Sequence, residues 1–191
     1  MVAGTVALLC ELNPALKTKQ PIVKSILAAG AGAKTRNYET IEANFKIYGA
    51  GIVDALAASY IVDAKHYSTA TGILSGAAGA SKSYSMYVTS SDTRMRVALA
   101  YSNRINIGSA SHSSSTSGAI LDGTIGEVSM TIYDPRGMVV AIKSASTPIT
   151  GANLKVAEFN TNGITGSYTI KITLNTPASG SRPTNFGVAW W

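Results

Sequence analysis

The hydrophobic positions of residues 1–62 recur every three or four residues, which is the spacing of an α-helix. The first stripe predicts a helix that ends before Pro14, because the residue preceding a proline is pushed out of the α region. Pro21 suits the first turn of a second helix, which the AAGAG run ends, and a third helix is predicted over residues 52–62. The three stripes consist of Val2, Val6, Leu8, Leu9 and Leu12; Ile22, Val23, Ile26 and Leu27; and Ile52, Leu56 and Tyr60.

Beyond about Lys65 the hydrophobic period changes to two, which is typical of strands with one buried face. The turn Asp134-Pro135-Arg136-Gly137 separates two of the predicted strands. The serine-rich segment 102–126 is interpreted as a long surface loop. Short strands joined by regular turns favour an antiparallel β-sandwich of jelly-roll-like type. The predicted strands are centred on residues 84–88, 95–101, 128–132, 138–142, 154–159, 168–174 and 186–190.

The change of period predicts an α+β chain with a helical part over 1–62, a linker over 63–80 and an antiparallel β-sandwich over 81–191. With 191 residues the chain is long enough to bury a sizeable core. It opens in an apolar run with no polar N-terminal cap, and three short helices cannot bury stripes of this size by themselves. We therefore interpret the chain as part of a larger protein.

The amino-acid composition of the chain narrows the classes of function that it could have. Hydrophobic residues make up 46% of the chain and charged residues 14%, with many Gly, Ser, Thr and Ala, which argues against disorder and is typical of extracellular β-domains. A net charge of +6 would suit a polyanion, but the sixteen Lys and Arg are scattered singly, so no nucleic-acid partner is expected. No membrane span is expected, and no signal peptide opens the chain.

The side chains able to do chemistry are few. Cys10 is the only cysteine and lies among leucines, which favours a buried structural role. His66 in the predicted linker and His112 in the serine-rich loop have no preorganised base, nucleophile and oxyanion donors around them. By alternation Trp190 faces the core and Trp191 faces outward, where its ring could stack on a sugar, cover a sheet edge or pack on the helical part.

Three stretches of the helical part resemble subtilisin-like serine proteases (subtilases). Residues 2–9, VAGTVALL, are similar to the helix that follows the catalytic serine, whose pattern is G-T-S-x-A-x-P-x-V-A-G. Asn13-Pro14-Ala15-Leu16 resembles the turn that ends that helix, and residues 48–55, YGAGIVDA, resemble the closing G-x-G-x-φ-(D/N)-A motif of the catalytic domain. The resemblance covers about residues 1–60. It implies a nucleophilic serine five residues before Met1, with the histidine and aspartate farther upstream, so no catalytic residue is expected within the chain.

Residues 80–191 resemble the β-sandwich domains that follow the catalytic domain in many subtilases, on residues 96–102, 129–137, 166–170 and 186–189. Such domains often carry D-L-D-L before a hairpin, where the carboxylates serve a calcium site, but the chain reads GEVSM there. The remaining calcium candidates are Asp122, Glu127 and Asp134, with ordinary surface carboxylates as the alternative. No other cofactor is expected.

The resemblance implies the C-terminal fragment of a secreted or cell-envelope serine endopeptidase that hydrolyses peptide bonds only in its full-length form. The partners expected are the rest of the catalytic domain, a protein or peptide substrate of the parent, and a second copy through the first helix. The sandwich would stabilise the catalytic domain or shape access to its cleft. The alternative is a non-enzymatic extracellular β-sandwich module that binds carbohydrate or a cell-surface partner.

Overall fold

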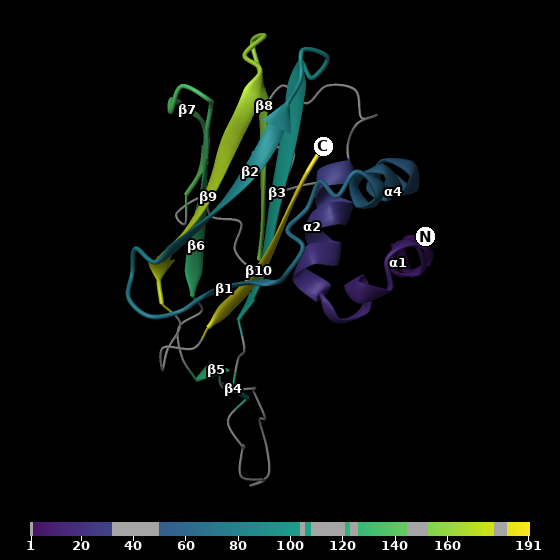
Figure 1. The fold of residues 1–191 in the computed structure, drawn as a ribbon. Coiled ribbons are helices and arrows are strands. Elements are labelled where there is room, and N and C mark those ends of the chain that lie inside the picture. Colours follow the sequence, from purple (N-terminus) through teal and green to yellow (C-terminus); the bar gives the residue numbers. More distant parts are fainter. Residues whose placement is uncertain are drawn as a thin grey trace, which may run out of the picture.

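A computed structural model describes residues 2–31, 50–103, 106–107, 121–122, 126–144, 153–177 and 183–191 (Figure 1). In this part of the chain, helices come first and antiparallel strands follow, so the fold is α+β and mostly sheet. The helices are α1 (Val2–Leu12), the 3₁₀ helix η1 (Pro14–Thr18), α2 (Gln20–Gly30) and α4 (Ala55–Asp63). The strands are β1 (Gly72–Leu74), β2 (Ser81–Val88), β3 (Arg94–Asn103), β4 (Asn106–Ile107), β5 (Leu121–Asp122), β6 (Glu127–Tyr133), β7 (Val139–Lys143), β8 (Leu154–Asn160), β9 (Gly166–Thr176) and β10 (Thr184–Trp190).

The strands form two four-stranded antiparallel sheets. The first sheet has the order β1-β10-β3-β8, and the second sheet has the order β2-β9-β6-β7. Alternate side chains from both sheets share one hydrophobic core, in which Leu99 and Val188 of the first sheet lie with Met130 and Ile170 of the second. Among the described residues, strands β4 and β5 pair with each other alone.

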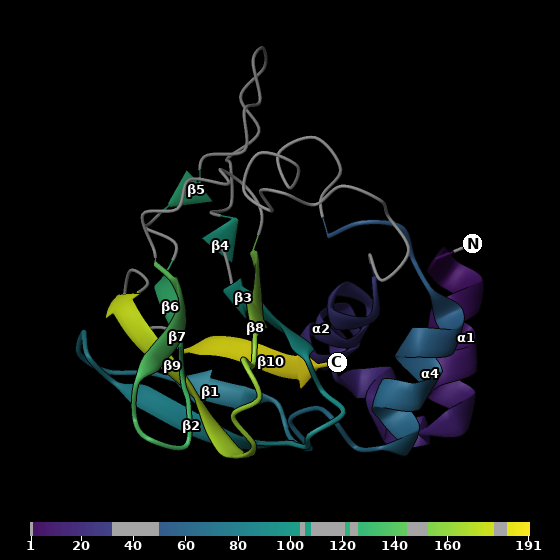
Figure 2. The ribbon, with the colours of Figure 1, turned by 90° about the horizontal axis from the view of Figure 1, so that it is seen from above.

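The central part of the first sheet is buried on both faces. On β3, Val97 and Leu99 point into the core between the sheets, while Ala98 faces the helices and belongs to a second cluster with Ile22 and Ile26 of α2. Figure 2 shows the helices gathered against this sheet, away from the second sheet. The helix-facing positions Ala98, Gly187 and Ala189 are small, which lets the backbone of α2 come close. A central strand buried on both faces loses the apolar–polar alternation of a half-exposed strand.

The helix ends follow local chemistry. Helix α1 ends at Leu12 as predicted, and the Asn13 Oδ1 then accepts a bond of 3.1 Å from the Ala15 amide at the start of η1. Helix α2 has Pro21 in its first turn, as predicted. Helix α4 begins at Ala55, later than the predicted residue 52, because the Asp54 Oδ1 caps it by accepting from the Leu56 and Ala57 amides at 3.0 and 3.1 Å.

Other segments differ from the expected layout. The 3₁₀ helix η1 begins at Pro14, where a simple turn was expected. The stretch interpreted as a linker contains β1, and the stretch interpreted as a loop contains the end of β3 together with β4 and β5. His112 lies outside the described residues, as do Tyr48 and Gly49. Within the described ranges, none of the helices has the length and apolar character needed to cross a membrane.

Candidate functional site

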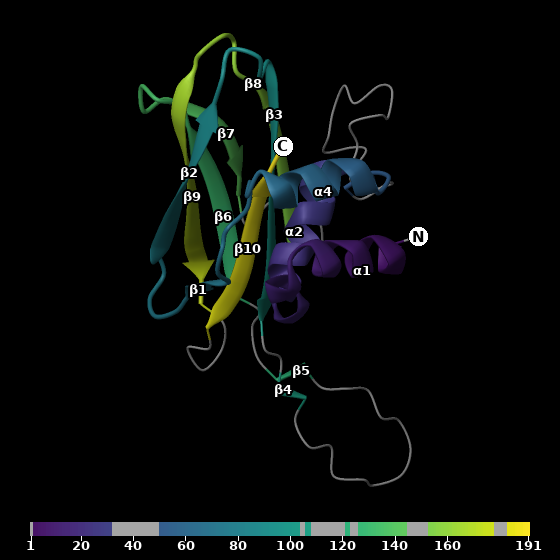
Figure 3. The same cartoon turned by 45° about the vertical axis from the view of Figure 1, so that its right-hand side comes forward.

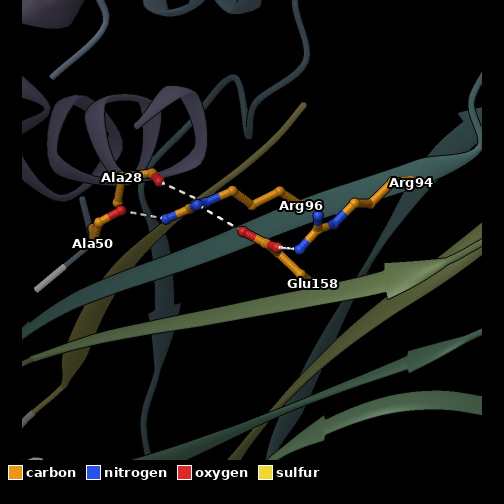
Figure 4. Close-up of polar contacts among 5 residues, drawn as sticks. All are labelled: Ala28, Ala50, Arg94, Arg96 and Glu158. Atoms are coloured by element: carbon orange, nitrogen blue, oxygen red, sulfur yellow. Dashed lines mark hydrogen bonds and ion pairs between the residues drawn. The ribbon is translucent and has the colours of Figure 1, made fainter. Parts of the chain in front are cut away.

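Arg96 joins the helical part to the first sheet (Figure 4). Its side chain rises from β3 beside Glu158 of β8, and the two residues are paired in the strand register. The Arg96 Nη1 donates to the Glu158 Oε1 at 2.7 Å, and the Nε donates to the Ala28 carbonyl at 3.1 Å. The Nη2 donates to the Ala50 carbonyl, and Arg94 completes the cluster by bonding the second Glu158 oxygen.

The surroundings of Arg96 explain why a buried cation is tolerated. Arg96 is 8% exposed, and the Glu158 carboxylate balances its charge. Ala28 lies in the last turn of α2, where carbonyls have no partner within the helix and the helix dipole favours a cation. A planar guanidinium can serve two carbonyls and one carboxylate at once. Arg96 therefore ties the end of α2 and the chain before α4 to the first sheet.

Helix α1 presents an apolar outward surface. Figure 3 shows α1 and α4 side by side, away from the second sheet. Leu9 of α1 and Ile61 of α4 are buried beneath them at 1% and 0% exposure. Glu11 is the only charged residue of α1, so its outward surface is mostly Ala, Gly and Leu. The large apolar side chains left about half exposed on the two helices are Val2, Leu8, Leu12, Leu56 and Tyr60.

The C-terminal strand closes against α4. Trp190 is buried in the core between the sheets, as predicted. Trp191 stacks on Tyr60 of α4, with 6.0 Å between ring centroids, which agrees with the interpretation that it packs on the helical part. Its backbone exchanges two hydrogen bonds with Arg96, at 2.8 and 2.9 Å. Trp191 therefore offers a sugar only part of its ring.

His66 has a partner that the sequence did not reveal. Its ring stacks on Trp190, with 6.0 Å between centroids, and its carbonyl accepts from the Trp190 amide at 2.9 Å. Burial lowers the pKa of His66, and the Asp92 carboxylate opposes this more weakly. The histidine therefore serves the junction between α4 and β10.

The lowered pKa of His66 makes stability depend on pH. Near and below about pH 6.5, the ordinary histidine pKa, the unfolded chain binds a proton at His66 more readily than the folded chain does. The stability that neutral His66 gives the folded chain is therefore complete above that pH and is lost as the pH falls. We expect the urea midpoint to drop between about pH 7 and pH 5 more steeply in the natural chain than in His66→Gln. Equal slopes for the two proteins would show that His66 titrates as freely as in the unfolded chain.

The structure does not bring the calcium candidates together. Glu127 begins β6 and Asp134 directly follows its last residue, so the two lie about 23 Å apart by the rise of a strand. Both Asp134 oxygens are already used: Oδ1 accepts from the Arg136 and Met138 amides at 2.9 Å, and Oδ2 accepts from the Arg136 guanidinium at 2.7 Å. Burial raises the pKa of Asp134, but these bonds outweigh it and hold the pKa below its usual value. This carboxylate serves the hairpin turn and does not fit a calcium ligand.

The remaining candidate residues for metal binding or chemistry are Asp122 and Cys10. The Asp122 side chain lies outside the described part of the structure, although the Asp122 backbone belongs to β5. Cys10 is half-buried against the helical core, more exposed than expected, and it is a free thiol. Within the described residues, no three His, Cys, Asp or Glu side chains gather where they could hold a metal ion.

Comparisons with known proteins place the chain in no family. No family model matches it, and no curated protein matches it. Among solved structures, the crystal structure of GEBA250068378 from Sulfurospirillum deleyianum is similar over 64% of this chain and 98% of that one, with 10% identity and a TM-score of 0.32. A similarity at this level carries no argument about function.

Proposed function

We propose that the chain is the C-terminal part of a subtilisin-like serine endopeptidase. In this proposal α1, α2 and α4 are the last helices of its α/β catalytic domain, and the two sheets are an appended β-sandwich of jelly-roll-like type. Peptide-bond hydrolysis belongs to the whole enzyme, through a serine that precedes Val2 in the longer chain. The 191 residues alone are inactive, because the nucleophile, its histidine base and the orienting aspartate lie elsewhere.

The observation that carries the proposal is the apolar outward surface of α1. Leu8 and Leu12 are 55% and 50% exposed on α1, and Leu56 on the neighbouring α4 is 61% exposed. Burying a leucine side chain is worth about 1.5–3 kcal/mol, so several exposed on adjacent helices indicate a surface that another part of a protein covers. In a subtilase the rest of the catalytic domain covers it. Without that cover, we expect two copies of the chain to associate through α1.

The residues of the closing motif have roles that support the same proposal. Gly51 has a φ of 109°, a conformation that favours glycine. Three residues later, Asp54 caps α4. The motif G-x-G-x-φ-(D/N)-A thus places a glycine and a capping side chain where this local turn requires them.

In this proposal the sandwich supports the three helices and fixes where they lie. Its first sheet holds α2 through Gly187 and Ala189, and Arg96 fixes the end of the same helix. Helix α4 packs closely on α2 at Gly30, where an added Cβ would lie 3.0 Å from the Ala58 backbone nitrogen, and α1 packs on α4 in turn. The helix that would follow the nucleophilic serine therefore rests on the sheets through two intervening helices. We infer that the sandwich sets the orientation of that helix in the enzyme.

A fluorophosphonate probe, which labels activated serines, tests the proposal. We expect the 191-residue chain to remain unlabelled, and the product of the same gene extended upstream through the whole catalytic domain to label stoichiometrically. Labelling of the extended protein should be abolished when the serine five residues before Met1 is changed to alanine. Labelling of the short chain, or an extended product with no reactive serine, would contradict the proposal.

A further inference from the structure

The outward face of the second sheet is unusually rich in hydroxyl groups. Alternate residues of β2, β9 and β6 bury their side chains in the core, and the residues between them face away from it. Neighbouring strands match these outward residues in register, so the hydroxyls lie side by side across the sheet, with Lys171 between Ser83 and Thr131. The central hydroxyls belong to Ser83, Ser85, Ser167, Thr169, Ser129 and Thr131.

Charge is sparse in the middle of this face. Lys171 is the only charged residue among the described outward positions from Ser83 to Tyr87, Ser167 to Thr173 and Ser129 to Tyr133. A nucleic acid or an anionic membrane would need a cluster of cations, which this face does not have. A peptide adding itself as a strand would use a sheet edge and leave the face free.

Two tyrosines lie among the hydroxyls. Tyr87 on the edge strand β2 is 71% exposed, the largest exposed fraction among the large hydrophobic and aromatic residues described. A ring so exposed adds little to the stability of the fold, because most of its apolar surface stays in water. Tyr133 on β6 is half-buried and faces the same side. Beside it on β7 lies Val139, which is also exposed.

The register fixes how far apart the tyrosines lie. Tyr87 pairs with Ser167 of β9, and Tyr133 pairs with Thr169 of the same strand. The two tyrosines are thus two strand spacings apart across the sheet and two residues apart along it, about 12 Å in all. This distance corresponds to a few sugar rings in an extended chain, and Ser and Thr hydroxyls fill the space between.

We propose that this face binds an uncharged, extended polysaccharide. A pyranose ring has an apolar C–H face that matches a tyrosine ring, and a rim of hydroxyls that serine and threonine side chains can bond as donors and acceptors. One sugar stacks on Tyr87 and another on Tyr133, while the sugars between them bond Ser167 and Thr169 of the central strand β9. This inference does not depend on the proposed protease function, since it concerns the face opposite the helices.

Binding to insoluble polysaccharide tests the inference. Microcrystalline cellulose and chitin are uncharged and present flat, extended chains, and the depletion of the 191-residue chain from solution measures binding to each. We expect binding to at least one of them, and about tenfold weaker binding for Tyr87→Ala and for Tyr133→Ala, which corresponds to about 1.4 kcal/mol. Tyr87→Phe should keep most of the affinity because it keeps the ring.

Matched controls distinguish binding by this face of the sheet from non-specific adsorption to the polysaccharide. Tyr60→Ala removes an aromatic ring of comparable exposure, 52%, on α4 and should leave binding unchanged. Raising the salt concentration should also have little effect, because no ion pair is involved. The inference is overturned if neither polysaccharide depletes the chain, if Tyr87→Ala binds as well as the natural chain, or if Tyr60→Ala weakens binding equally. Thermal unfolding of each variant checks that the fold is intact.

Discussion

Replacing Gly187 by alanine is expected to destabilise the fold by about 3 kcal/mol, although it adds a single methyl group. A Cβ at this position would lie 2.5 Å from the Ile22 Cα and backbone nitrogen and 2.7 Å from the Pro21 carbonyl carbon. These are backbone atoms of α2, so no side-chain rotation can make room. The helix would have to lift from the first sheet, which would loosen the packing of Ile22 and Ile26.

Urea denaturation compares Gly187→Ala with Gly4→Ala as a matched control. Gly4 lies inside α1 with no atom within 4 Å of its added Cβ, so alanine there should stabilise the chain by up to about 1 kcal/mol through helix propensity. The two glycine-to-alanine changes should therefore act in opposite directions. A stability of Gly187→Ala within about 0.5 kcal/mol of the natural chain would mean that α2 does not lie against β10 as described.

Replacing Arg96 by methionine is expected to cost about 3–5 kcal/mol, because it breaks a buried ion pair and leaves its partners behind. The Glu158 carboxylate, 9% exposed, would lose its buried partner, and the Ala28 and Ala50 carbonyls would lose the donors from Arg96. Arg96→Lys should recover little, because an ammonium group cannot reproduce the fork that serves these acceptors.

Two variants test whether the loss of a positive charge alone explains the effect of Arg96→Met. Arg94 bonds the same carboxylate from a side chain that is 56% exposed, so Arg94→Met should cost less than about 1 kcal/mol. Methionine at both Arg96 and Glu158 removes the stranded charge and should recover part of the loss. Equal effects of Arg94→Met and Arg96→Met on the urea midpoint would show that Arg96 does not hold the helices to the sheet.

Local patterns predicted the elements well, because their causes are local. The stripe from Val2 to Leu12 and the proline after it determine where α1 lies and ends. The alternation along β9 places Tyr168, Ile170, Ile172 and Leu174 in the core. The turn that begins at Asp134 joins β6 to β7. In each case, the residues responsible lie within a few positions of the feature they cause.

The junction between helices and sheets was not predictable, because its partners are far apart in sequence. Arg96 stands in a strand, where a charged residue ordinarily indicates the solvent face, yet it meets Ala28 and Glu158 in the interior. The packing of Trp191 on the helical part was one of the interpretations of the sequence, but its partner Tyr60 and the His66 partner of Trp190 lie more than a hundred residues away and were not predicted. The small residues of β10 were the one available signal, since an alanine- and glycine-rich strand face suits close packing of a helix.

The catalytic residues of the proposed enzyme would precede Met1, so the coding sequence immediately upstream of the Met1 codon tests the proposed function most directly. We expect that sequence to encode G-T-S-x-A-x-P leading into Val2-Ala3-Gly4, with the histidine and aspartate motifs of a subtilase farther upstream. A stop codon and a ribosome-binding site directly before Met1 would contradict the protease assignment. The resemblance would then describe ancestry, and a binding role for the sheets would be the better assignment.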